Sequence, residues 1–167
     1  MDAQLVESIK EVYEQEFSHL EADREKYESL LDDIEDIDEG PKGPEKWKDI
    51  EAIANRIETL YSCFERIFKR IARKIDGMDL SGESWHKVLL KRMSQETDDR
   101  PAVINDETKE RLMEFLKFRH YVRKNYVHFV EWEEMIWLVE SYPRIYSQVQ
   151  GHLDDFVSML ENAATDE

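Results

Sequence analysis

The chain has 167 residues and a formal net charge of -16, with 41% hydrophobic and 37% charged residues. This length suits one domain with a substantial buried core, and the apolar and aromatic content excludes a disordered chain. The acidic balance argues against sequence-independent binding to nucleic acid or to a membrane surface, because both depend on a basic surface. Any nucleic acid must therefore be bound locally.

The compartment follows from the cysteine content and from the first residues. Cys63 is the only cysteine, so neither an internal disulfide nor a thiolate metal site is expected. The N-terminal residues lack the basic and apolar regions of a signal peptide, and no run approaches the ~18 apolar residues of a membrane span. These features predict a soluble, cytoplasmic protein.

Residues 1–40 predict a long acidic helix whose apolar stripe is interrupted near Glu16 and Asp23. The segment holds fifteen acidic side chains against three basic ones, Lys10, Arg24 and Lys26. One interpretation is a solvated and partly detached helix. The other is a helix that engages a basic protein partner or shields a cationic site. We assign residues 1–40 and residues 41–167 to the same single domain.

Residues 45–76 predict the clearest helix, because their apolar side chains recur at alternating steps of three and four. This pattern places the helix at the centre of the core. Its stripe consists of Ile50, Ile53, Ile57, Leu60, Phe64, Ile67 and Ile71. A basic face follows near its end, and we assign RNA binding to three of its side chains, Arg66, Arg70 and Arg73.

The remaining elements are also helical. We expect a short helix over 84–97, a helix that Asp106 caps and that runs to about Val127, and two pieces, 132–142 and 144–160, separated at Pro143. The sequence thus predicts an all-α antiparallel bundle of about five to six helices. Four aromatic side chains near the C-terminus favour core or interface packing over base stacking: Trp132, Trp137, Tyr142 and Tyr146.

Residues 119–126 combine cationic, imidazole and phenolic side chains, the groups that phosphodiester chemistry requires. Arg119 falls on the apolar stripe of its helix, where an unpaired charge loses much of its hydration. One interpretation is a structural ion pair with a carboxylate of the central helix. Three glutamates there have suitable positions, Glu51, Glu58 and Glu65.

The other interpretation of Arg119 is a phosphate site. Arg123 and Tyr126 project on the same side of the helix as Arg119. A second line lies about 100° round the helix and contains His120, Lys124 and His128. Two guanidinium groups beside an imidazole are typical of a site that binds and transforms a phosphate.

These residues resemble the signature of HepT-like toxins, a group of HEPN ribonucleases: an arginine, four residues, a histidine, one residue and a tyrosine. Arg119 and Tyr126 occupy the first and last places, and Lys124 occupies the middle place. The similarity to cyanobacterial HepT-like sequences covers roughly residues 50–160. It runs through Tyr61, Glu65-Arg66-Ile67, Asp76-Gly77 and the segments 81–86, 100–104 and 118–120.

The resemblance implies a homodimer joined through the signature helix, with a site that cleaves cellular RNA, such as tRNA, without a metal or other cofactor. The arginine would hold the scissile phosphate while a histidine transfers a proton during attack of the 2′-hydroxyl. An MNT nucleotidyltransferase antitoxin would neutralise the toxin by transferring AMP to the signature tyrosine, here Tyr126.

Lys124 departs from the signature. A lysine is almost fully protonated at neutral pH, so it is a poor general base but a good phosphate ligand. We therefore assign catalysis to Arg119, His120, Arg123 and Lys124, with His120 favoured for proton transfer and His128 as the alternative base. The alternative function is a noncatalytic helical dimer of the same fold that binds RNA or a protein partner.

Two Glu-x-x-His pairs have the spacing that di-iron bundles use, Glu16 with His19 and Glu83 with His86. The second pair lies within the segment that resembles the HepT-like family, which has no such site. We assign no metal to either pair.

Overall fold

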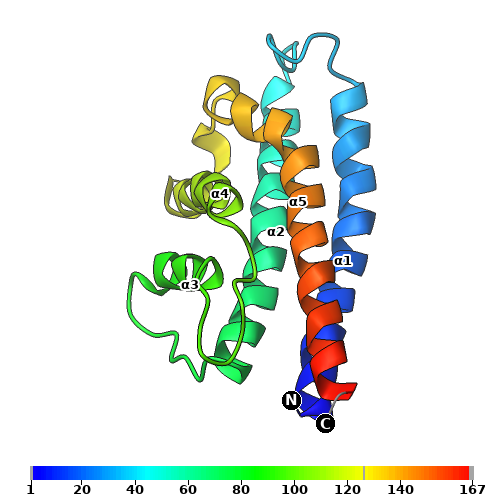
Figure 1. Cartoon of the computed structure of the whole chain (residues 1–167). Helices are drawn as coiled ribbons and strands as arrows, with labels where there is room; N and C mark the ends of the chain where they lie inside the picture. Colours follow the sequence, from blue (N-terminus) through cyan, green and yellow to red (C-terminus); the bar gives the residue numbers. More distant parts are fainter. Residues whose placement is uncertain (1, 126, 166–167) are drawn as a thin grey trace.

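The computed structural model describes residues 2–125 and 127–165, and these residues contain helices and no strand. The order is α1 (Ala3–Asp32), α2 (Lys46–Lys74), α3 (Trp85–Met93), α4 (Asp106–Asn125), the short 3₁₀ helix η1 (Val127–Phe129) and α5 (Trp132–Thr165). The predicted all-α helical bundle is confirmed (Figure 1). None of the described helices is long and apolar enough to cross a bilayer.

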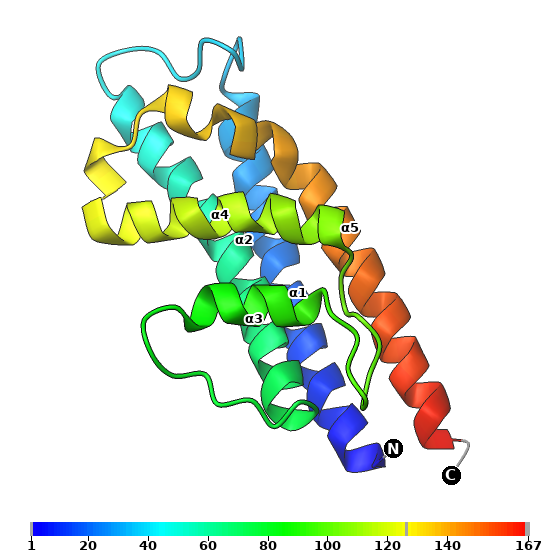
Figure 2. The ribbon, with the colours of Figure 1, turned by 60° about the vertical axis from the view of Figure 1, so that its left-hand side comes forward.

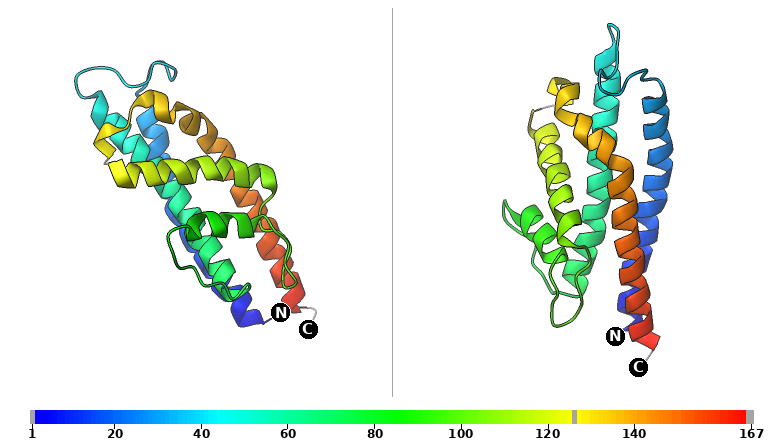
Figure 3. Two further views of the ribbon diagram at one scale, coloured as in Figure 1. Left: turned by 90° about the vertical axis from the view of Figure 1, so that its left-hand side faces the viewer. Right: turned by 45° about the horizontal axis from the view of Figure 1, so that its top comes forward.

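Three long helices form the body of the molecule. Helix α1 runs antiparallel to α2 and α5, and these two run in the same direction (Figure 1). Helices α3 and α4 lie across α2 on one side of the molecule (Figures 2 and 3). One continuous apolar core contains side chains from all five α-helices.

Helix α2 occupies the centre of the core, as its apolar stripe predicted. Every residue of that stripe is buried. The helix ends where Gly77 adopts a φ of +59° and the Met78 N–H donates to the Ala72 carbonyl at 3.0 Å. Gly77 tolerates this left-handed conformation because it has no Cβ, and the turn directs the chain toward α3.

Helix α1 packs against α2 and is not partly detached, so this expectation was wrong. The two acidic residues that interrupt its stripe are buried, Glu16 and Asp23, which are 7% and 8% exposed. Glu16 accepts two hydrogen bonds from Arg66 at 2.7 and 2.8 Å, and Asp23 pairs with Arg56. The face of α1 that packs against α2 therefore includes two carboxylates, and arginine partners on α2 make their burial possible.

Helix α4 begins where expected, but Asp106 is not its cap. The side chain of Asn105 accepts a hydrogen bond from the Thr108 N–H at 2.8 Å. Asp106 lies in the first turn and pairs with Lys109 at 2.8 Å. The prediction was displaced by one residue because aspartate and asparagine are both good caps and stand next to each other here.

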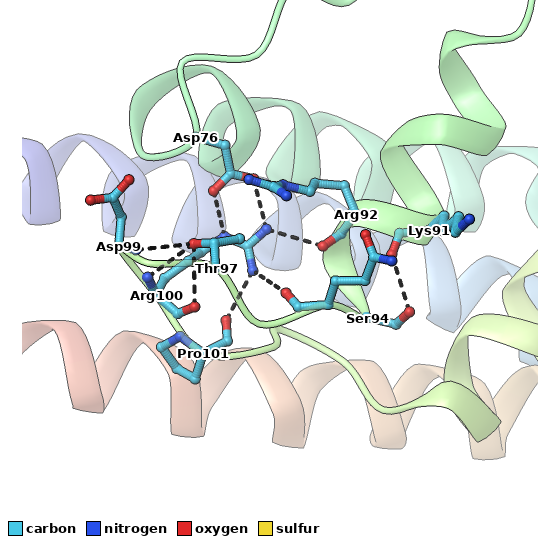
Figure 4. Close-up of polar contacts among 9 residues, drawn as sticks. Asp76, Lys91, Arg92, Ser94, Thr97, Asp99, Arg100 and Pro101 are labelled. Atoms are coloured by element: carbon cyan, nitrogen blue, oxygen red, sulfur yellow. Dashed lines mark hydrogen bonds and ion pairs between the residues drawn. The ribbon is translucent and has the colours of Figure 1, made fainter.

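The connection between α3 and α4 is held by Arg100, which is 3% exposed (Figure 4). Its Nε and one terminal nitrogen donate to the Asp76 carboxylate at 2.9 and 2.7 Å. The guanidinium also donates to the carbonyl oxygens of Arg92, Gln95 and Pro101. Because Asp76 follows α2, this one side chain ties the ends of α2 and α3 to the loop that leads into α4.

Helix α5 is continuous through Pro143, whereas the sequence predicted two separate pieces. A proline inside a helix leaves the carbonyl four residues earlier without its backbone donor. That carbonyl belongs to Val139, and the hydroxyl of Tyr27 donates to it at 3.0 Å. The first turns of α5 run at an angle to the rest of the helix (Figure 2), so the proline bends the helix without ending it.

Candidate functional site

A cavity of about 480 Å³ lies between α4 and the start of α3. Four of the residues that line it were predicted from the sequence, and these are Arg119, His120, Arg123 and Lys124. The other two are Glu83, in the turn before α3, and His86, in the first turn of α3. The predicted catalytic set lies on α4, and α3 lies beside α4 where both cross α2 (Figure 2), so that Glu83 and His86 join the same cavity.

Arg119 is held behind this surface by α2. Its side chain is 7% exposed, with Nε 3.5 Å from Glu58 and a terminal nitrogen 3.4 Å from Glu65. Its Nε also donates to the Ser62 hydroxyl at 3.1 Å. The predicted ion pairs with Glu58 and Glu65 are confirmed, while Glu51 instead contacts His128. The guanidinium therefore pairs with the buried Glu65 and the half-buried Glu58, and it also borders the cavity.

Arg123 and Lys124 supply the accessible positive charge. The side chain of Arg123 is 58% exposed and lies 3.0 Å from Glu58, which it shares with Arg119. Lys124 is exposed, and within the described part of the chain no carboxylate pairs with it. An anion in the cavity would meet Lys124 and Arg123 first, with Arg119 behind them.

Two imidazoles border the cavity, and their ring centroids are 5.1 Å apart at an interplanar angle of 77°. His86 Nδ1 lies 2.6 Å from Glu65, whose side chain is 6% exposed. For His120, burial lowers the pKa from its usual value, and the nearby positive charges of His86, Arg119 and Lys124 lower it further. The lowered pKa favours the neutral ring of His120, which is the form that accepts a proton.

The sequence placed both His86 and Glu65 in segments that resemble the HepT-like family, but the one role considered for His86 was that of a metal ligand and the one for Glu65 was that of a partner of Arg119. The fold joins them across 21 positions of sequence. The sequence did indicate that Glu65 needs a hydrogen-bond donor, because it is a glutamate on the buried side of the central helix. The residues near Glu65 in the sequence do not identify His86 as that donor. In the other Glu-x-x-His pair, Glu16 with His19, the glutamate forms an ion pair with Arg66.

The alternative base predicted from the sequence, His128, lies outside this cavity. His128 belongs to η1, where Nδ1 contacts Glu51 at 2.6 Å and the side chain is 66% exposed. Tyr126, the predicted acceptor of AMP, lies outside the described residues.

The basic face of α2 borders a second cavity of about 480 Å³, between α1 and α2. Arg66 is bound to Glu16 there, and Arg70 donates to the Ser8 hydroxyl at 2.9 Å. Arg73 is exposed. The lining also contains Lys69 and Lys74. The three arginines assigned to RNA binding therefore share one groove, in which Glu16 is the one carboxylate of the described lining.

A third cavity, of about 450 Å³, lies between α4 and α5 and includes Phe118, Tyr121 and Trp137. Trp137 is 43% exposed, whereas the other members of the C-terminal aromatic group are buried, Trp132, Tyr142 and Tyr146. Core packing is therefore confirmed for three of the four. Trp137 remains on the surface, next to the outer side of the signature helix.

The protein is an all-α helical bundle with a cavity lined by cationic side chains and imidazoles. A comparison with protein families identifies the family to which this bundle belongs. The family model described as HepT-like protein matches residues 52–160, well over half of the chain. The protein belongs to the HepT-like family. The match includes every residue of the cavity between α3 and α4 and excludes α1. Comparisons with curated proteins and with solved structures find no match.

Proposed function

We propose that this protein is the toxin of a HEPN/MNT toxin–antitoxin pair, a cytoplasmic ribonuclease that cleaves cellular RNA such as tRNA without a metal. The observation that carries the proposal is the cavity between α3 and α4. It collects three cationic side chains and two imidazoles in a chain whose net charge is -16. This local composition suits an RNA phosphate, whereas the overall negative charge of the chain would repel it.

The chemistry requires a proton acceptor and positive charge near the phosphate. The RNA 2′-hydroxyl attacks the adjacent phosphorus, the O2′–P bond forms, and the P–O5′ bond breaks. The products are a 2′,3′-cyclic phosphate and a 5′-hydroxyl. Lys124 and Arg123 bind the phosphate oxygens, Arg119 adds charge from behind, and neutral His120 accepts the 2′-hydroxyl proton.

The groove between α1 and α2 binds the RNA backbone on one side of the scissile phosphate. Lys69 links the two places, because it lines the groove and its Nζ lies 4.7 Å from the centre of the Trp85 ring. Trp85 in turn stacks on His86 at 3.6 Å. Arg66, Arg70 and Arg73 therefore extend a basic path from the cavity, and salt should weaken RNA binding along it.

The partners in this proposal are a second copy of the chain and an MNT nucleotidyltransferase. The dimer forms through α4, the signature helix, and the antitoxin transfers AMP to Tyr126. The added negative charge next to Arg123 and Lys124 would repel RNA phosphate. Intact mass after incubation with the antitoxin and ATP should show added AMP in wild type and in Tyr121→Phe. Retention of the modification in Tyr126→Phe would place it on another residue.

Cleavage is tested with a labelled RNA in the presence of EDTA. We expect wild type to cut, and the double variant Arg123→Ala/Lys124→Ala to cut at least tenfold more slowly. Lys117→Ala is the matched control, because Lys117 is an exposed cation on the same helix outside this cavity. Arg119→Ala should abolish cutting, and its folding must be checked because it leaves two glutamates without their arginine. Wild-type cleavage by a folded Arg119→Ala protein would refute the catalytic assignment.

The second candidate is a noncatalytic helical dimer that binds RNA or a protein partner. Lys124 in the histidine place favours it, and so does the engagement of Arg119 with Glu58 and Glu65. RNA binding that depends on Lys124 and Arg123, in a wild-type protein that never cuts, would support this function over cleavage.

A further inference from the structure

The signature helix lacks a histidine at position 124, yet RNA cleavage by 2′-hydroxyl attack needs two proton transfers. One proton leaves O2′ and one reaches O5′. The helix contributes one imidazole to the cavity, His120. We propose that His86, held by Glu65, is a second catalytic residue and forms an acid–base pair with His120. The inference rests on the proposed ribonuclease function and assigns the group that replaces the missing histidine.

The contact between His86 and Glu65 has the geometry of an oriented catalytic imidazole. Nδ1 lies 2.6 Å from the Glu65 carboxylate, which is buried and also contacts Arg119. The carboxylate acts as the acceptor for both neighbours, so Nδ1 carries a hydrogen. That leaves Nε2 as the nitrogen available for proton transfer. Glu65 is a positioning residue, since it acts through His86.

The ring of His86 is fixed from a second direction. Trp85 stacks on it with centroids 3.6 Å apart and an interplanar angle of 28°, and Lys69 lies over the Trp85 ring. The other imidazole stands on α4 with its centroid 5.1 Å away. Both rings border the cavity that Arg123 and Lys124 also line. A phosphate bound to these cations therefore has one imidazole on the α3 side and one on the α4 side.

The two imidazoles have different surroundings, so we assign one as the proton acceptor and the other as the proton donor. His120 has its pKa lowered by burial and by neighbouring positive charge, so it takes the O2′ proton. His86 faces a carboxylate, which balances the ring's charge when Nε2 carries a proton, and it donates that proton to O5′ as the P–O5′ bond breaks. Exchange with water then returns both rings to their starting forms. Glu83 and Lys124 are the remaining charged groups of the lining, apart from the two arginines.

The competing explanation is structural: His86 would serve only as a donor to the buried Glu65. Glutamine at position 86 keeps an amide donor but cannot transfer a proton, so His86→Gln separates the two roles. We expect His86→Gln and His86→Ala to lower kcat by about 10²–10⁴-fold with little change in KM. Free imidazole should restore part of the activity of His86→Ala, and His19→Ala, an exposed histidine on α1, should behave as wild type.

The results with these variants either support or overturn the catalytic role of His86. Wild-type kcat in either His86 variant overturns the assignment and leaves the ribonuclease proposal intact. A slow His86→Ala variant that imidazole does not rescue, together with an active His86→Gln variant, shows a structural donor and also overturns it. If wild type cuts no RNA in EDTA at any pH from 5 to 9, the ribonuclease proposal fails and this inference fails with it. Melting temperatures of both variants near that of wild type exclude unfolding as the cause of a slow rate.

Discussion

The hydroxyl of Tyr27 on α1 donates a 3.0 Å hydrogen bond to the backbone carbonyl of Val139 on α5. This carbonyl is the one that Pro143 deprives of its helical donor. Tyr27 is 1% exposed and stacks on Tyr142 with ring centroids 4.0 Å apart. A side chain from the first helix thus completes the backbone hydrogen bonding of the last, and the bend of α5 depends on α1.

Tyr27→Phe should lower the free energy of unfolding by about 1–3 kcal/mol, because it leaves a buried carbonyl without a donor. Tyr142→Phe is the matched control. The Tyr142 hydroxyl is also buried, but it has no hydrogen-bond partner among the described residues. Its removal should leave stability unchanged or raise it. Urea denaturation of both variants measures the difference, and equal losses would contradict the role assigned to Tyr27.

Arg100 should be the most sensitive charged residue outside the cavity. Arg100→Met removes both Arg100 hydrogen bonds to the buried Asp76 carboxylate and its hydrogen bonds to three carbonyl oxygens, and we expect a loss of about 3–5 kcal/mol in the free energy of unfolding. Arg92 also contacts Asp76, at 3.1 Å, but its side chain is 37% exposed. Arg92→Met should therefore cost less than about 1 kcal/mol. Thermal denaturation of the two variants tests this order.

The sequence predicted those parts of the structure that depend on local periodicity. The stripe of α2 and the buried position of Arg119 follow from helical spacing alone. The errors concern features that a distant partner decides. Pro143 was read as a helix boundary because its compensation comes from Tyr27, 112 positions away. His86 could not be placed in the site, because only the crossing of α3 over α2 brings it to Glu65.

The pair between Glu16 and Arg66 should make stability depend on pH. Burial alone raises the pKa of Glu16, but hydrogen bonds from Arg66 and Cys63 outweigh it, and the net pKa lies below the ordinary value of 4.5. A carboxyl group with a lowered pKa stabilises the fold above its unfolded-state pKa and loses that contribution as pH falls through its folded-state pKa.

We expect Glu16→Gln to be about 1–2 kcal/mol less stable than wild type at pH 7. The difference should shrink below pH ~4.5, as protonation removes the advantage of wild type. Glu14→Gln, at an exposed position of the same helix, should show no such convergence. Denaturation curves between pH 3 and pH 7 measure the stability difference between wild type and Glu16→Gln. A constant difference across this range would contradict the stabilising role of the Glu16–Arg66 ion pair.

Trp137 should contribute to self-association in the proposed dimer. It is 43% exposed beside Phe118 and Tyr121 of the signature helix, and an exposed aromatic cluster bordered by charged side chains is typical of an interface. Trp137→Glu should weaken the dimer at least tenfold in sedimentation velocity. Trp47→Glu is the control, because Trp47 is 51% exposed at the start of α2, outside this cluster. Equal association of both variants would show that the dimer interface lies on another surface.

The pKa of His120 gives a test of the cavity that does not depend on activity. In wild type it should lie below the usual 6.5, because burial and the charges of His86, Arg119 and Lys124 disfavour the imidazolium. Substitution of His86 by glutamine removes one of those charges, so the pKa of His120 should rise. It should stay below 6.5, since burial is the largest cause and remains. Titration of the imidazole resonances by NMR measures the change. His19→Gln, on α1, should leave it unaltered, and an unshifted His120 in the His86→Gln protein would show that the two rings do not interact.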